Sequence, residues 1–369
     1  MAAELRPGRW GRSHFVGASF FVVLLFSCFA YYLAFAAEFR YYDDDSGLFQ
    51  LALNAHDHLV YLENISRLRD GEFAYYELRN DVGIAAMYSV LAAIAPFLVD
   101  ESFSLIALSF NLLTLCLCYA LYSAICDRLQ LGIAGKVSFV ANLSLIYFAQ
   151  LINKDMLTVL VFLLAAWSGL KGRVLWLLAL LPLMAIIRQQ LALFTLIYVL
   201  LMVVRRPIRW MVFLYILTAF VAGLLSVFAS LFGAESLEDG FTAYLVEFNR
   251  QYYVGYIIFN PLRALQYVVD AYLSFSFWTE TGGIDTAKLL RLPQLVLLTC
   301  LVAPLSKLVT RFASALQQPS CKPLVVVVVS YMLVWLMNPT VNARYVMLIT
   351  PILVLFALHV RRHKLLASR

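Results

Sequence analysis

Long apolar runs, separated by short polar segments, extend through most of this chain. An α-helix needs about 20 apolar residues to cross a hydrocarbon layer, and it satisfies its own backbone hydrogen bonds there. Runs of this kind, several of them shorter than that length, predict about ten spanning helices: 15–37, 103–126, 137–152, 156–170, 174–188, 189–204, 210–232, 292–306, 323–338 and 345–359. The pattern therefore predicts an all-α polytopic membrane protein.

Composition supports this prediction, since 63% of the residues are hydrophobic and 14% are charged, with a mean hydropathy of +0.83. Such values are typical of integral membrane proteins. No linker and no internal repeat divides the chain, so we expect one integral domain over 1–369. The net charge of +6 arises mostly from basic loops and gives no reason to expect a nucleic-acid partner. The cysteines form no CxxC pair, so neither a disulfide framework nor a zinc site is indicated.

Positive charge predicts how the runs are oriented, because basic loops stay on the cytoplasmic side of a membrane. The run 15–37 follows a basic segment and is too long for a signal-peptide core, so we expect it to span. If 38–102 then lies outside, the later basic loops and both termini all fall on the cytoplasmic side. The stretch 83–98 is accordingly predicted to be a surface or re-entrant helix. A second large outer loop, 233–291, holds another predicted surface helix, 261–278, for which a span is the alternative.

The first outer loop, 38–102, concentrates polar groups on a predicted surface helix. A helix that begins near Asp57 brings Asp57, Tyr61 and Asn64 to one side at three- and four-residue steps. Gly71 is a natural terminator for that helix. The Asp57 carboxylate can act as a general base or hold a divalent cation, although the helix dipole alone also favours an acid at a helix start.

Three further polar breaks fall on the same predicted outer face. They are 153–155 between two apolar runs, 188–190 with no loop between the apolar runs on either side, and 338–345 near the C-terminus. Ionisable residues at membrane depth are costly and mark functional sites by default. These cations and polar groups suit a lipid phosphate. The predicted substrate- and phosphate-binding residues are Lys154, Arg188, Gln189, Arg344, Tyr61 and Asn64. The alternatives are a local ion pair within 153–155 and an interfacial anchor for Arg344.

These short motifs resemble the GT-C superfamily of membrane glycosyltransferases. The resemblance lies in the first outer loop with its two surface helices and Asp57, in the break 153–155 that opens an apolar helix, and in 342–345 followed by Pro351. It covers most of the chain, and each motif is short. Among the departures from that superfamily, a single acid flanked by histidines, His56-Asp57-His58, stands where an acidic pair is usual.

The resemblance implies a reaction and roles for individual residues. The chain would move a sugar from a polyprenyl-phosphate donor to a glycan or lipid acceptor, with inversion at the anomeric carbon. Asp57 would be the catalytic or metal-holding acid, Asp155 the second acid, and Arg344 a contact to the donor phosphate. A divalent cation, Mg²⁺ or Mn²⁺, would be held by Asp57 and Asp155. We expect an integral protein of the bacterial inner membrane, surrounded by lipid, with its active site on the periplasmic or extracellular face.

Two other functions stay open on the sequence. A polysaccharide repeat-unit polymerase of the Wzy or EpsG kind would also present outer-face arginines, and the pair 188–189 suits it. A transporter or flippase of a lipid-linked anion usually has internal repeats, which the sequence lacks. A central role for Asp57 favours the transferase, whereas a dominant role for Arg188 and Arg344 favours the polymerase.

Overall fold

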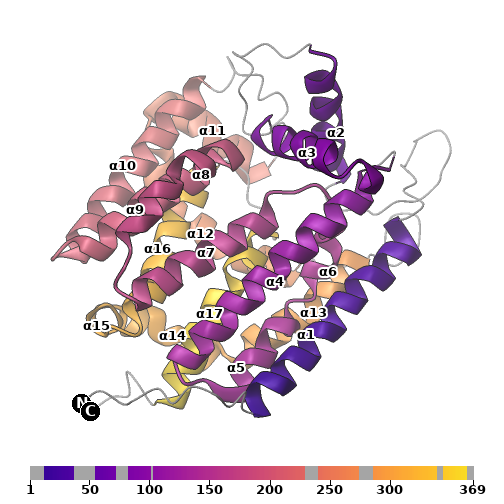
Figure 1. The fold of residues 1–369 in the computed structure, drawn as a ribbon. Coiled ribbons are helices and arrows are strands. Elements are labelled where there is room, and N and C mark those ends of the chain that lie inside the picture. Colours follow the sequence, from indigo (N-terminus) through magenta and orange to yellow (C-terminus); the bar gives the residue numbers. More distant parts are fainter. Residues whose placement is uncertain are drawn as a thin grey trace.

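The computed structural model describes residues 12–36, 55–71, 82–100, 103–228, 240–273, 286–338 and 344–363. Over these residues the chain forms helices and no strand. The prediction of an all-α protein is therefore confirmed for the part that the structure describes. Most long helices run side by side in one bundle, and α2 (Ala55–Arg69) and α3 (Val82–Ile94) lie together at one end of it (Figure 1).

Among the described helices, four are long and apolar enough to cross a membrane. They are α1 (Arg12–Tyr31) with its π-helical extension η1 (Tyr32–Ala36), α4 (Ser104–Arg128), α10 (Pro207–Phe228) and α17 (Arg344–Arg362). A fifth is formed by α13 (Thr286–Cys300) and α14 (Val302–Thr310) if two helices bent by 62° are counted as one span. The described chain thus has four or five helices that could span a membrane, which is compatible with an integral membrane protein.

The remaining predicted spans fall on shorter or broken helices, so the prediction of about ten spans is not confirmed. Three are single helices of 14 to 16 residues: α7 (Asp155–Leu170), α9 (Gln189–Val203) and α16 (Lys322–Trp335). Two predicted spans are divided into shorter helices. The segment 174–188 forms η5 (Leu175–Leu180) and α8 (Leu181–Ile187). The segment 137–152 is shared by α5 (Gly132–Ser138), η4 (Phe139–Ala141) and α6 (Ser144–Phe148).

The break within 137–152 coincides with buried amide side chains that bond elsewhere. Asn142 Nδ2 donates to the Met347 carbonyl at 3.3 Å, and Gln150 Nε2 donates to the Cys28 carbonyl at 3.0 Å. Amide side chains that find backbone partners compete with regular helix. The apolar pattern of the run carries no sign of these distant partners, so a single helix was the wrong expectation for this segment.

The helix α7 lies inside the bundle, where it packs against α4, α16 and α17 (Figure 1). Its residues after Asp155 are largely apolar on all sides, and a helix of that pattern is expected to be buried. Phe162 of α7 packs against Phe194 of α9 and Trp335 of α16, with ring centroids 4.6 and 5.4 Å apart. This packing places the middle of α7 in the interior, and Asp155 at the start of the helix is buried as well.

Other helices agree only in part with the sequence predictions. Gly71 follows α2 with a φ of +71°, the left-handed conformation that ends a helix, as predicted. The predicted helix 261–278 is α12 (Gly255–Leu273), which begins earlier and contains Pro261. The helix α11 (Gly240–Tyr252) was not predicted, and both α11 and α12 pack against α10. The short elements η3 (Pro96–Leu98) and α15 (Phe312–Gln317) complete the described helices.

Gly83 in α3 lies directly against the backbone of α8. A β-carbon at this position would overlap the Ile186 carbonyl oxygen, so the close approach of the two helices requires glycine. We expect Gly83→Val to lower the free energy of unfolding by about 1–3 kcal/mol, because the helices must separate. Thermal unfolding of the purified protein in detergent measures the change. Ala93→Val, at an exposed position of α3, is the matched control, and equal stability of the two variants would contradict the contact.

Candidate functional site

Four polar segments that are far apart in the sequence meet at one end of α7. They are α2, the break before α7, the junction of α8 with α9, and the end of α16 with the start of α17. The same four segments carry the polar groups that were predicted from the sequence to share the outer face. Their contacts define the candidate site.

The break before α7 is held by asparagine side chains. Asn153 Oδ1 accepts the backbone N–H groups of the first two residues of α7 at 3.0 and 3.2 Å, as an N-terminal capping residue does. Asn111 of α4 donates through Nδ2 to carbonyls of the unwound segment, the nearest being Leu151 at 2.9 Å. These bonds satisfy an irregular buried backbone, and they hold Lys154 and Asp155 at the start of α7.

Arg188 is a single extended residue between α8 and α9, with φ −163° and ψ 114°. Its Nη1 donates to Asp155 Oδ1 at 3.1 Å and lies 3.5 Å from the Thr158 hydroxyl, and its Nε donates to Gln190 Oε1 at 2.6 Å. The Arg188 and Asp155 side chains are buried, with 6% and 5% of their surface exposed. Arg188 Nη2 makes no hydrogen bond to the described part of the chain.

Two aromatic rings lie beside the Arg188 guanidinium. Its central carbon is 5.1 Å from the centroid of the Trp335 ring and 5.9 Å from that of Tyr345, within the range of cation–π attraction. The Tyr331 hydroxyl donates to the Tyr345 carbonyl at 2.9 Å, which ties the start of α17 to α16. The rings shield the guanidinium from water, and charge interactions are stronger where water is excluded.

The helix α2 docks on the break before α7 through His58 and Tyr61. His58 is fully buried, and its Nδ1 accepts the backbone N–H of Ile152 at 2.9 Å. Lys154 Nζ lies 5.4 Å from the centroid of the Tyr61 ring, a cation–π contact. The structure therefore brings together Tyr61 and Lys154, two of the predicted binding residues, and His58 anchors α2 beside them.

The other predicted site residues are placed less completely. Asp57 and Arg344 lie in the first turns of α2 and α17, and their side chains lie outside the described part of the structure. Asn64 is half-buried on α2, and Gln189 is exposed at the start of α9. Gln190, the third residue of the predicted break 188–190, accepts the hydrogen bond from Arg188 Nε. Nothing in the apolar pattern distinguishes these two glutamines.

A metal site is not formed by the side chains that the structure describes, among which no group of three or more His, Cys, Asp or Glu gathers. Asp155 Oδ1 is engaged by Arg188, and His58 Nδ1 is engaged by a backbone N–H. The predicted pair of Asp57 and Asp155 depends on a carboxylate outside that description. A bound Mg²⁺ or Mn²⁺ therefore stays a prediction.

Arg263 of α12 is a further residue beside the site, and it was not among the predicted site residues. It is 1% exposed, and its guanidinium donates to the Asn260 side chain and the Leu336 carbonyl, both at 2.7 Å. It also donates to the Asn338 carbonyl. Burial lowers the pKa of this guanidinium, which as an arginine still stays charged at neutral pH. Arg263 thus fixes the turn that follows Trp335.

We expect Arg263→Met to lower the free energy of unfolding by about 1–3 kcal/mol for each buried carbonyl that loses its donor. Thermal unfolding in detergent measures the loss. Arg209→Met removes an exposed arginine from α10 and should have little effect. Similar stability of the two variants would show that the Arg263 hydrogen bonds do not hold the turn.

Comparison of the chain with models of protein families, with curated proteins and with solved structures gave no match. A function has to be inferred from the side chains themselves. They comprise a buried arginine aimed by a carboxylate and an amide, a lysine against a tyrosine, and two aromatic rings beside the arginine.

Proposed function

We propose that this chain is an inverting membrane glycosyltransferase of the GT-C kind. It moves a sugar from a polyprenyl-phosphate donor to a glycan or lipid acceptor. The observation that supports the proposal is the buried Arg188–Asp155 pair, which lies where Lys154 and α2 also meet. The cations Lys154 and Arg188 suit a phosphate leaving group. The acid in the first turn of α2, Asp57, suits an acceptor hydroxyl that must be activated.

In the proposed reaction, the acceptor hydroxyl oxygen attacks the anomeric carbon on the side opposite to the phosphate. As the new carbon–oxygen bond forms, the bond to the phosphate oxygen breaks, and its electron pair leaves with the lipid phosphate. Asp57 accepts the hydroxyl proton as general base. Lys154, Arg188 and Arg344 stabilise the charge that develops on the phosphate. A single displacement of this kind inverts the anomeric carbon, and retention of configuration in the product would exclude it.

Asp155 and Gln190 serve this reaction through Arg188 and do not touch the substrate. They bond to Nη1 and Nε, so the guanidinium plane is fixed before a phosphate arrives, and Nη2 is the edge that meets it. Preorganised donors of this kind stabilise a developing charge without rearrangement. Lys154 brings a second cation beside the Arg188–Asp155 pair, and cations at this place favour an anionic ligand.

The proposed protein has about ten spans, with the site on the periplasmic or extracellular face of the bacterial inner membrane. The segment 38–102 is then the outer loop that carries α2 and α3. The lengths of α7, α9 and α16 do not oppose this count, because broken or short helices are tolerated at membrane depth when protein surrounds them.

The test is the mass profile of lipid-linked and surface glycans in cells with and without the gene. A transferase predicts the loss of one constant sugar mass and the accumulation of the unmodified acceptor. A transporter of a lipid-linked anion predicts unchanged glycan masses that are trapped on the cytoplasmic side. Unchanged masses on the correct side would contradict every function considered for this chain.

A polysaccharide repeat-unit polymerase is the second candidate, and the prominence of Arg188 in the described site favours it. A phosphate-gripping arginine serves a polyprenyl-diphosphate oligosaccharide as well as a polyprenyl-phosphate sugar. The same glycan profile separates the two functions. Collapse of a long-chain ladder to a single repeat indicates a polymerase.

A further inference from the structure

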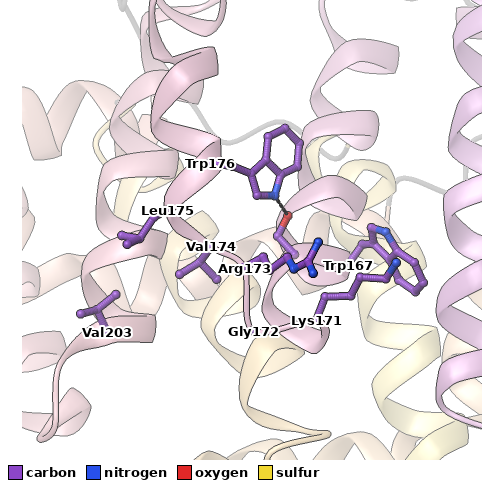
Figure 2. A pocket seen from close by; sticks show the side chains of 9 residues that line it. Trp167, Lys171, Gly172, Arg173, Val174, Leu175, Trp176 and Val203 are labelled. Carbon is purple, nitrogen blue, oxygen red and sulfur yellow. Dashed lines mark hydrogen bonds between the residues drawn. The ribbon is translucent and has the colours of Figure 1, made fainter.

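A pocket of about 630 Å³ lies at the other end of α7 from Arg188. It forms where α7 ends and η5 begins, beside the last turn of α9, and its main walls are Trp167, Lys171, Arg173, Leu175, Trp176 and Val203 (Figure 2). Its first cation, Lys171, follows Asp155 of the candidate site by 16 residues along α7. At about 1.5 Å per residue that separation is roughly 24 Å, which approaches the thickness of a hydrocarbon layer.

A glycine turn builds this pocket. Gly172 has a φ of +68°, the Arg173 N–H bonds to the Ser168 carbonyl at 2.9 Å, and the Gly172 N–H bonds to the Gly169 carbonyl at 3.1 Å. These are the bonds of a helix C-terminus closed by a residue in the left-handed conformation. The turn sets Lys171 and Arg173 on either side of Gly172. Both cations therefore line a defined turn and not a variable loop.

Two tryptophans form part of the walls, and both are held by contacts. Trp176 Nε1 donates to the Ser168 hydroxyl at 2.8 Å (dashed line in Figure 2). Lys171 Nζ lies 4.3 Å from the Trp167 ring centroid. In the view of Figure 2, Arg173 projects between Trp176 and the pair of Lys171 and Trp167. Tryptophan is the residue that membrane proteins concentrate at the headgroup level of a bilayer.

We propose that this pocket binds the phosphate of an anionic phospholipid in the leaflet opposite to the Arg188 site. Among the described residues that line it, Lys171 and Arg173 are cationic and none is acidic. Leu175 and Val203 are 62% and 59% exposed, so apolar surface for an acyl chain adjoins the charges. A charged head beside an apolar tail matches this combination, whereas a free phosphate would leave the exposed leucine and valine unused.

The test is native mass spectrometry of the full-length protein released from nanodiscs that contain phosphatidylglycerol and phosphatidylcholine. Wild type should retain phosphatidylglycerol, and the double variant Lys171→Gln/Arg173→Gln should lose roughly tenfold or more of that binding. The control Lys307→Gln/Arg311→Gln removes the same charge around the α14–α15 junction and should retain the lipid. Equal loss of phosphatidylglycerol in both double variants would show that only the net charge of the protein matters, and this would overturn the proposal. Retention of the lipid by both variants would overturn it as well.

A second arm separates the lipid from a soluble anion. Inorganic phosphate at millimolar concentration is added to the wild-type protein in detergent, and retention of phosphatidylglycerol is measured again. A lipid site predicts little displacement, because the acyl chain contributes to binding. Complete displacement by phosphate, with no preference for the lipid, would overturn the assignment to a phospholipid. Thermal unfolding of the double variant Lys171→Gln/Arg173→Gln shows whether its fold is retained. The variant Lys171→Arg/Arg173→Lys keeps both positive charges at the turn and should therefore retain phosphatidylglycerol.

Discussion

Arg188→Lys is expected to lower the rate of sugar transfer by about 10²–10³-fold. Lysine keeps the positive charge but loses the planar fork that holds Asp155 and Gln190 while offering Nη2 to a phosphate oxygen. The measurement is kcat/KM with a polyprenyl-phosphate donor in purified, reconstituted protein. Because the fork acts on the departing phosphate, the loss should appear mainly in kcat.

The contribution of Arg188 to stability can be separated from its role in the reaction by replacing its ion-pair partner Asp155 as well. Arg188→Ala leaves the Asp155 carboxylate buried without its cation, and loss of one member of such a pair costs about 3–5 kcal/mol of stability. The double variant Arg188→Met/Asp155→Leu replaces the pair with apolar side chains and should regain most of that stability. It should stay inactive, because the fixed Nη2 donor that Arg188 offers to the phosphate is then lost.

A stable and active double variant would remove Arg188 from the reaction and leave the ion pair as a structural feature. Gln190 accepts a hydrogen bond from Arg188 Nε, so Gln190→Ala should lower activity. Unchanged activity in that variant would mean that the hydrogen bond to Nε has no positioning role.

Long apolar runs predicted the helices α1, α4, α10 and α17 well, because the length and composition of such runs are local properties. Local rules also predicted the end of α2, since Gly71 adopts the left-handed conformation that only glycine accepts readily. Local rules could not predict that the segment 137–152 is divided. Its amide side chains bond to carbonyls 122 and 205 residues away along the chain, and the hydropathy of the segment gives no information about such distant partners.

In the candidate site, too, some residues could be predicted from the local sequence and others could not. Arg188 and Lys154 were predicted because an ionisable residue inside an apolar stretch is costly wherever it is placed. Thr158 carried a weak signal that could have been used, as it lies one turn after Asp155 on the same side of α7. Trp335 carried none, because its contact with Arg188 comes from the packing of α16 against α7 and α9. Residues that act through tertiary contacts need the structure.

Asp57→Asn is expected to lower transfer by about 10²–10⁴-fold, the usual contribution of a general base. Asparagine has nearly the size of aspartate and is compatible with a helix start, so α2 should keep its place through His58 and Tyr61. In cells that lack the gene, wild type should restore the missing sugar mass and Asp57→Asn should not. Glu63→Gln removes an exposed acid from the same helix and should restore it fully.

Comparison of the two single variants, Asp57→Asn and Arg188→Lys, decides between the two proposed enzymes. A transferase with Asp57 as general base loses activity in both variants, because proton removal and departure of the phosphate belong to one displacement. A polymerase that depends on its arginines loses activity only with Arg188→Lys. If Asp57→Asn restores the glycans fully while Arg188→Lys does not, α2 is a docking helix and the arginine alone remains at the centre of the site.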